Sequence, residues 1–422
     1  MLGSFQSALK VGDLRAKILF TLGMFLVFRL GAHIPVPGIN PQVFEKLLAN
    51  NQLFGFFDLI SGGAFKRFSI FAMSITPYIN ASIIMQLLQV VVPRLEQLAK
   101  EGEEGRKKIT QYIRYGTVVL GFIQAIGMAL AMSRYPGAVE HPGIGSYLLI
   151  AVSLTAGTAL LMWIGEMITD KGIGNGISLI IFAGIVARIP SALSGIVQLT
   201  AAGTIGFFNL FGFIVIALVV IVAVVAMNEG QRRIPVQYAK RVVGRRVYGG
   251  QSTFLPLRVN MGGVIPIIFG MSLMMFPATV ASWFSRGPVT NFINTYFNFQ
   301  TPLYNVLYAL LIFFFTYFYV AIIFNPTDVS ENIKKYGGFI PGIRPGRPTA
   351  DYIDRVLSRL TFAGGIFLAF IAILPNFVIA ITGITNAWFG GTALLIVVGV
   401  ALDTMKQMEA HLLLRSYEGF VK

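Results

Sequence analysis

The chain has 422 residues, of which 55% are hydrophobic and 12% are charged, and its formal net charge is +15. Soluble globular proteins carry about 25% charged residues, so the composition excludes that class and indicates a polytopic membrane protein. The sequence contains no cysteine and only three isolated histidines. We therefore expect no disulfide, no metal site and no cysteine nucleophile.

Windows of about 20 apolar residues predict ten transmembrane helices. They follow a short amphipathic stretch, 1–17, which does not resemble a cleavable signal, so we expect it to stay on the mature protein. An even number of spans places both termini on the same side of the membrane. The predicted spans are 16–34, 71–92, 112–132, 146–168, 176–198, 208–227, 257–280, 302–324, 360–380 and 391–410.

The segment before the second span, 54–65, is apolar but too short to cross a hydrocarbon core of about 30 Å. Irregular backbone at that depth is tolerated only inside protein or in a water-filled cavity, so we interpret this segment as re-entrant. The second span carries Pro77, Asn80, Gln86 and Gln89. Polar side chains at bilayer depth face protein or water, which predicts that this helix borders a pathway. The alternative is an external loop followed by a span whose polar groups only pack against other helices.

The lysines and arginines are distributed unevenly over this topology. Most of the 33 lie on the side shared by the termini, which the positive-inside rule assigns to the cytoplasm. Two long basic loops project on that side, at about 228–258 and 325–359. Such loops suit an acidic or RNA-rich partner, although they could also be plain tethers. The basic residues on the opposite side are Arg29, Lys46, Lys66, Arg67, Arg134, Arg188 and Arg286.

The spans divide into two halves of five, 1–200 and 205–422, joined by a turn that contains glycine. If the halves are repeats, an odd number of spans in each requires them to be inverted, as in many membrane transporters with a pathway between the repeats. The embedded carboxylates are few, and Glu166 and Asp403 lie near helix ends rather than in a deep proton relay.

Two glycine-rich patterns bear on nucleotide binding. No GxxxxGK[ST] phosphate loop is present anywhere in the chain. The stretch GIGNGIS at 172–178 precedes a span and follows no predicted strand. We interpret it as a closely packed helix start at which Asn175 supplies a polar cap.

Seven long motifs run through nearly the whole chain: SITPYINASIIMQLL, KEGEEGRKKITQYIRYGT, GIGNGISLIIFAGIVA, RRIPVQYAKRVVGRRVYGGQSTFLPLRVNMGGVIPIIF, FPATVASW, FNPTDVSENIKKYGGFIPGIRPG and FGGTALLIVV. Together they closely resemble the bacterial SecY family, whose members form the pore of the protein-export channel in the cytoplasmic membrane. The resemblance implies an all-α fold of ten transmembrane helices in two inverted five-helix halves, with a pore between the halves and a re-entrant plug segment.

The resemblance also implies a constriction of six aliphatic side chains, all of them isoleucine in this chain. Both pairs that share a helix are spaced i,i+4, which puts each pair on one helix face. An aliphatic ring excludes water and ions by dewetting and offers a passing peptide no hydrogen bonds. Without the resemblance these residues would be interpreted as ordinary core residues. The implied ring is Ile75, Ile79, Ile177, Ile181, Ile268 and Ile396.

Two movable parts follow from the same resemblance. A plug at about 53–65 would fill the external funnel, and glycine would make its displacement locally easy. A lateral gate, through which signal sequences leave for lipid, would lie between the second and third spans and the seventh. The implied plug residues are Phe54, Phe57 and the hinge Ser61, Gly62 and Gly63, and the implied gate residues are Thr76, Asn80 and Gln124.

The basic loops resemble the docking sites for the motor ATPase SecA and the ribosome, with Arg245, Arg246 and Arg344 at contact positions. The missing phosphate loop agrees with this, because the driving force must then come from a partner. The chain departs from many relatives at 346–348, where an acidic or amide-containing run is typical. Other implied partners are the small membrane subunits SecE and SecG, polypeptides with signal sequences, membrane lipids and further accessory subunits.

The leading prediction is a passive, gated conduit for unfolded polypeptide, with no catalytic residue and no cofactor. A secondary solute transporter is the alternative, since inverted halves and broken helices fit it equally well. A transporter needs a compact polar site near the midplane, whereas the implied constriction is wholly aliphatic.

Overall fold

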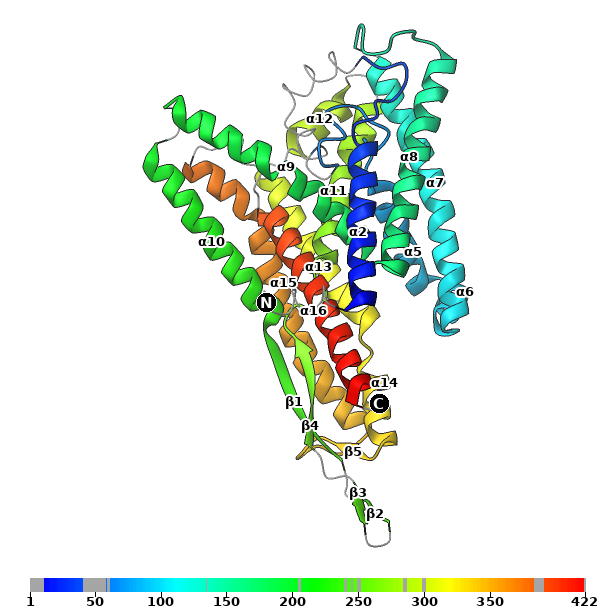
Figure 1. The fold of residues 1–422 in the computed structure, drawn as a ribbon, viewed down its shortest axis with the longest axis vertical. Coiled ribbons are helices and arrows are strands. Elements are labelled where there is room, and N and C mark those ends of the chain that lie inside the picture. The colour runs from blue at the N-terminus through cyan, green and yellow to red at the C-terminus, as the bar shows by residue number, and fades with distance from the viewer. Residues whose placement is uncertain are drawn as a thin grey trace.

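The computed structural model describes residues 11–40, 58, 61–133, 135–203, 206–238, 241–243, 246–248, 252–283, 287–297, 301–382 and 391–420. Helices dominate this part of the chain and lie side by side along the long axis of the molecule, while strands project beyond them at one end (Figure 1). The described C-terminal helix ends near the strands (Figure 1).

A helix of described residues overlaps each of the ten predicted spans. Before residue 205 the helices are α2 (Gly12–Gly31), α5 (Thr76–Val91), α6 (Pro93–Lys100), α7 (Glu103–Ser133), α8 (Ile144–Lys171) and α9 (Gly176–Ala201). After it they are α10 (Phe207–Glu229), α11 (Ile265–Trp283), α12 (Pro288–Tyr296), α13 (Pro302–Ile323), α14 (Pro326–Lys335), α15 (Arg347–Thr382) and α16 (Gly391–Phe420).

Among the described residues, six helices are long and apolar enough to cross a membrane. A seventh span results if α5 and α6, which meet at a bend of 101°, are counted as one. Only 11% of the apolar window of α10 is buried inside the protein, so this helix needs a surrounding apolar medium. The chain is therefore a multi-pass membrane protein, and the total of ten spans stays a prediction.

The helix of the second span begins later than predicted. Residues 61–75 form successive turns, and α5 starts only at Thr76. Two residues other than glycine in these turns, Phe68 and Ser74, have left-handed backbone at φ 45° and 53°, a conformation that cannot continue a helix. Pro77 then occupies the first turn of α5, where its missing N–H has no helical partner to lose.

The basic loops contain strands that the sequence analysis did not predict. Strands β1 (Gln231–Tyr238), β4 (Ser252–Arg258) and β5 (Gly338–Phe339) form an antiparallel sheet in the order β4-β1-β5. The β1–β4 register runs from Gln231 opposite Arg258 to Gln237 opposite Ser252. Two short strands, β2 (Arg241–Val243) and β3 (Arg246–Tyr248), pair with each other beyond this sheet (Figure 1).

The sheet has a small core of its own. Ile234 and Val236 of β1 alternate with exposed neighbours, as period-two packing requires. They pack with Leu257 of β4, Ile333 of α14 and Ile353 of α15. The strands are thereby fixed to the ends of two helices and do not hang as free loops.

Candidate functional site

The six predicted ring isoleucines come from four helices that lie far apart in the sequence. Ile75 is the N-cap residue of α5 and its carbonyl accepts the N–H of Ile79 at 3.1 Å. Ile177 and Ile181 belong to α9, Ile268 to α11 and Ile396 to α16. All six belong to or pack against one apolar cluster, in which five are buried and Ile177 is partly buried. Helices from before and after residue 205 thus contribute to one apolar cluster, which also contains aromatic residues such as Phe269 and Phe315.

The predicted gate residues also lie together. Thr76, Asn80 and Gln124 line a small cavity of about 30 Å³ that Ser272 and Thr279 of α11 close from the other side. Ser272 donates a hydrogen bond of 2.6 Å from its Oγ to Asn80 Oδ1. Ser272 is buried, so this bond is shielded from competing water.

Sequence reasoning missed Ser272. The same argument that singled out Asn80 would have found it, because a hydroxyl in the apolar stretch of the seventh span also needs a protein or water partner. The remaining lining residues include the methionines Met73, Met128 and Met275. Methionine side chains adapt to irregular gaps, so they suit the lining of this small cavity.

The predicted plug hinge is tightly packed against α9. Ser61 is fully buried, and Gly62 and Gly63 have left-handed backbone at φ 66° and 88°, which favours glycine. A Cβ on Gly62 would lie 2.8 Å from the Cα of Gly184, so the two backbones touch where only glycine fits. Phe54 and Phe57 lie outside the described residues.

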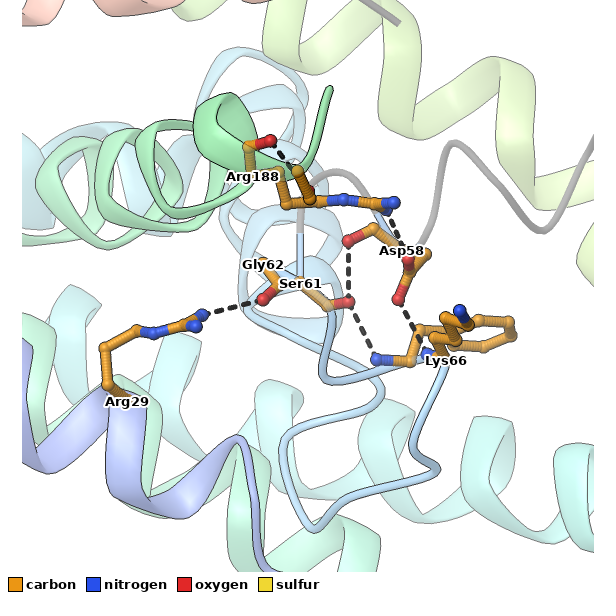
Figure 2. A network of polar contacts seen from close by, with 8 residues as sticks. Arg29, Asp58, Ser61, Gly62, Lys66 and Arg188 are labelled. Carbon is orange, nitrogen blue, oxygen red and sulfur yellow. Dashed lines mark hydrogen bonds and ion pairs between the residues drawn. The ribbon is translucent and has the colours of Figure 1, made fainter. Parts of the chain in front are cut away.

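A polar network holds this hinge from two sides (Figure 2). Asp58 accepts the backbone N–H of Lys66 at 2.6 Å through Oδ1, and its Oδ2 pairs with Arg188 of α9. Ser61 Oγ accepts the N–H of Phe65 at 2.9 Å. On the other side Arg29 of α2 donates from Nη1 to the carbonyl of Gly62 at 2.8 Å.

Sequence reasoning missed the three charged members of this network. Asp58 is an acidic residue within the apolar segment 54–65, and Arg29 and Arg188 are among the basic residues on the side with few of them. A charge that departs from the pattern of its surroundings was the available signal. Nothing in the sequence, however, pairs residues that are 130 positions apart.

Two of the three predicted partner-binding arginines, Arg246 and Arg344, lie at the end that carries the strands. Arg344 is exposed, in a loop whose backbone is held by Thr349 Oγ1, which donates to the Arg344 carbonyl at 2.9 Å. Ser330 of α14 fastens the same loop by donating to the Gly346 carbonyl at 2.7 Å. Arg246 begins β3 at the far tip of the projection (Figure 1), and Arg245 lies outside the described residues.

Two predictions about helix ends are confirmed. Asn175 caps α9, since its Oδ1 accepts the N–H of Ser178 at 3.1 Å. The helix start is closely packed, because a Cβ on Gly176 would lie 1.8 Å from the Gly165 carbonyl oxygen.

Glu166, near the end of α8, accepts contacts from two guanidinium nitrogens of Arg114 of α7. Nε lies 2.9 Å from Oε1 of Glu166 and Nη2 lies 2.8 Å from its Oε2. This pairing gives Glu166 a structural partner on a neighbouring helix.

The fold is similar to that of solved structures described as protein-conducting channels. A SecY structure described as showing that the plug domain stabilises the closed state of the translocation channel aligns at a TM-score of 0.67 and 18% identity, over 94% of this chain and 92% of that chain. Sec61 in a canine ribosome–channel complex from the endoplasmic reticulum aligns at 0.62 and 17% identity, over 94% and 92%.

The sequence comparisons name the family. The SecY family model matches residues 69–405, and the protein translocase subunit SecY of Halalkalibacterium halodurans is 54% identical over 431 residues, covering 100% of both chains. The chain belongs to the SecY family. It is a channel-forming subunit of the protein translocase and not an enzyme, and the comparisons give no support to the solute-transporter alternative.

Proposed function

We propose that unfolded polypeptide crosses this channel through the isoleucine ring between two halves, 1–200 and 205–422, and that apolar segments leave sideways between α5, α7 and α11. One observation carries the proposal. The ring isoleucines come from helices of both halves, and beside them the Asn80–Ser272 bond joins α5 to α11. A pathway between the halves therefore opens where the ring and the gate both lie.

The chemistry of each part suits its proposed role. Isoleucine side chains exclude water and ions when they touch, yet they make no hydrogen bond that would retain a passing chain. At the gate, an incoming apolar helix offers packing that replaces the contact of α5 with α11 at the cost of one hydrogen bond. A signal segment thus shifts an existing equilibrium between closed and open gates.

The orientation in the membrane follows from charge. We propose that the end with the strands, where the basic loops lie, faces the cytoplasm together with both termini, in the cytoplasmic membrane of a bacterium. The bacterial source of the Halalkalibacterium halodurans relative supports this assignment.

The same end is the proposed docking site for the partners that drive transport. The sheet fixed on α14 and α15, together with the exposed Arg344, presents a rigid basic surface to the motor ATPase SecA or to the ribosome. The canine Sec61 structure, described as a ribosome–channel complex, supports the ribosome. We assign the small membrane subunits SecE and SecG, lipids and further accessory subunits to the surface around the bundle, where α10 has little protein cover.

A disulfide experiment tests the pathway, using a chain that has no native cysteine. Ile79→Cys is placed in reconstituted membranes, and a secretory chain with one cysteine is stalled in transit. The matched control is Ile366→Cys on α15, a helix that carries no ring or gate residue; Ile366 is 49% exposed. A substrate disulfide with Ile79→Cys and none with Ile366→Cys is expected. The reverse pattern would move the pathway away from the ring.

A further inference from the structure

The plug base, defined here as Asp58 and residues 61–66, makes polar contacts with α2 and α9. Arg29 of α2 donates to the carbonyl of Gly62, and Arg188 of α9 pairs with Asp58. Figure 2 shows the two arginines approaching the plug base from opposite sides. Both helices belong to the proposed half 1–200, so these contacts tie the plug base to that half.

One face of α9 carries both the ring and the plug contact. Ile177, Ile181, Gly184 and Arg188 follow one another at spacings of four, three and four residues, which places them in a single stripe along the helix. Arg188 is seven residues beyond Ile181, or roughly 10 Å along the axis at 1.5 Å per residue. The charge contact therefore lies about two turns beyond the constriction, with the Gly62–Gly184 backbone contact between them.

Asp58 uses its two carboxylate oxygens for two different purposes. Oδ1 accepts the N–H of Lys66 and closes the plug base on itself, while Oδ2 reaches α9 through Arg188. The side chain of Asp58 is 5% exposed and that of Arg188 is 28% exposed. Removing only the arginine leaves the buried Asp58 carboxylate unpaired, which is strongly unfavourable. Removing only the carboxylate is less unfavourable, because Arg188 keeps part of its contact with solvent.

We propose that the Asp58–Arg188 ion pair is a lock that holds the plug on α9, so that release of the plug is a step separate from parting of the gate at Asn80–Ser272. The inference rests on the proposed plug role of this segment. The lock acts mainly on the rate of release, because the two charges must separate while Asp58 is still poorly hydrated. Once the plug base has moved into water, hydration replaces the lost pairing.

The lock predicts an unusual order among charge-neutralising variants. Arg188→Gln leaves the Asp58 carboxylate buried without its cation, so it should loosen the plug most. Asp58→Asn keeps an oxygen that can accept the Lys66 N–H and removes only the charge, so its effect should be smaller. The double variant removes both charges and should behave like Asp58→Asn, which means that the second substitution partly repairs the first.

The experiment measures plug release through a reporter cysteine. Ala64 is fully buried in the plug base, and Ala64→Cys introduces the only thiol in the protein. The rate of labelling by a membrane-impermeant maleimide, added from the side opposite the strands, is compared in the parent, Asp58→Asn, Arg188→Gln and the double variant. Asp13→Asn and Arg15→Gln, two exposed positions of α2, serve as matched controls for loss of each charge.

We expect Arg188→Gln to speed labelling about tenfold or more, the double variant to fall back toward Asp58→Asn, and the controls to match the parent. Equal rates in all variants, or a double variant whose acceleration is the product of the two single ones, would overturn the lock. A secretory chain stalled in the parent channel distinguishes failure of the lock from failure of the plug role. If the stalled chain does not speed labelling, the plug assignment itself is wrong; if it does and the variants do not, only the lock is wrong.

Discussion

Ser272 on α11 and Asn80 on α5 are joined by a hydrogen bond of 2.6 Å, although they are 192 residues apart in the sequence. The bond crosses between the two proposed halves in the small cavity that also receives Thr76 and Gln124. It identifies the position on the seventh span that faces Asn80, which the sequence alone could not supply.

Cysteines at these two positions should lock the gate. With Asn80→Cys and Ser272→Cys in one chain, oxidation is expected to form a disulfide and block export, and a reductant should restore it, because the contacting side-chain atoms are already adjacent. Each single variant, treated with the same oxidant, is the control. Export that continues through a fully crosslinked channel would show that the gate need not open.

Removing only the hydroxyl should weaken the closed gate without blocking it. Ser272→Ala leaves the side-chain oxygen Oδ1 of Asn80 without this donor in a poorly hydrated place, at a cost of about 1–2 kcal/mol to the closed state. That corresponds to a shift of roughly 5- to 30-fold toward the open gate. The shift is measurable as a faster rate of crosslinking between lipid-side probes and a stalled signal segment. Thr155→Val, which removes a hydroxyl bonded within its own helix to Ala151, should leave that rate unchanged.

Polar substitution in the ring should open a leak. Ile79 and Ile181 are 6% and 1% exposed, and replacing both with serine puts hydroxyls where dewetting is needed. We expect higher ion conductance of the resting channel in planar bilayers than for the parent. Ile366→Ser at an exposed position of α15 is the control. Parental conductance in the double variant would remove these two positions from the constriction.

The helices were predictable because membrane spans have a strong local signature. Each of the ten apolar windows overlaps a described helix, including α13 and α15, since the apolar length needed to cross the bilayer appears directly in sequence. The start of α5 was not predictable. The windows place this start at residue 71, whereas α5 begins at Thr76 because the backbone at Ser74 is left-handed. The residue types in this stretch do not predict that conformation.

The site was predictable only in part, for a related reason. Nothing local separates Ile181 from other isoleucines, so the family resemblance had to supply the predicted ring. The structure adds that all six isoleucines belong to or pack against one apolar cluster. The Asp58–Arg188 pair is a long-range contact with no local pattern. The strands were not predicted, because the alternation of apolar residues at Ile234 and Val236 is short and lies among charged residues.

The two hinge glycines should respond differently to alanine. Both have left-handed backbone, so each substitution carries a strain of about 1 kcal/mol. A Cβ at Gly62 would in addition lie 2.8 Å from the Cα of Gly184, whereas a Cβ at Gly63 meets nothing within 4 Å. Gly62→Ala should therefore displace the plug from α9, seen as faster labelling of the Ala64→Cys reporter. Equal labelling rates in Gly62→Ala and Gly63→Ala would show that the close backbone contact does not hold the plug.

Reversing the charge of Arg344 should separate docking from folding. Its side chain is exposed, and the hydrogen bonds that fasten its loop use the carbonyls of Arg344 and Gly346, so Arg344→Glu leaves the loop's own contacts in place. We expect normal insertion and thermal stability but a loss of ATP-driven export with the motor ATPase, because an attractive contact becomes repulsive. Arg94→Glu makes the same charge change at an exposed position of α6, outside both basic loops, and should retain export. Undiminished export by Arg344→Glu would move the motor contact to another part of this surface, and the strands β2 and β3 would be the next to test.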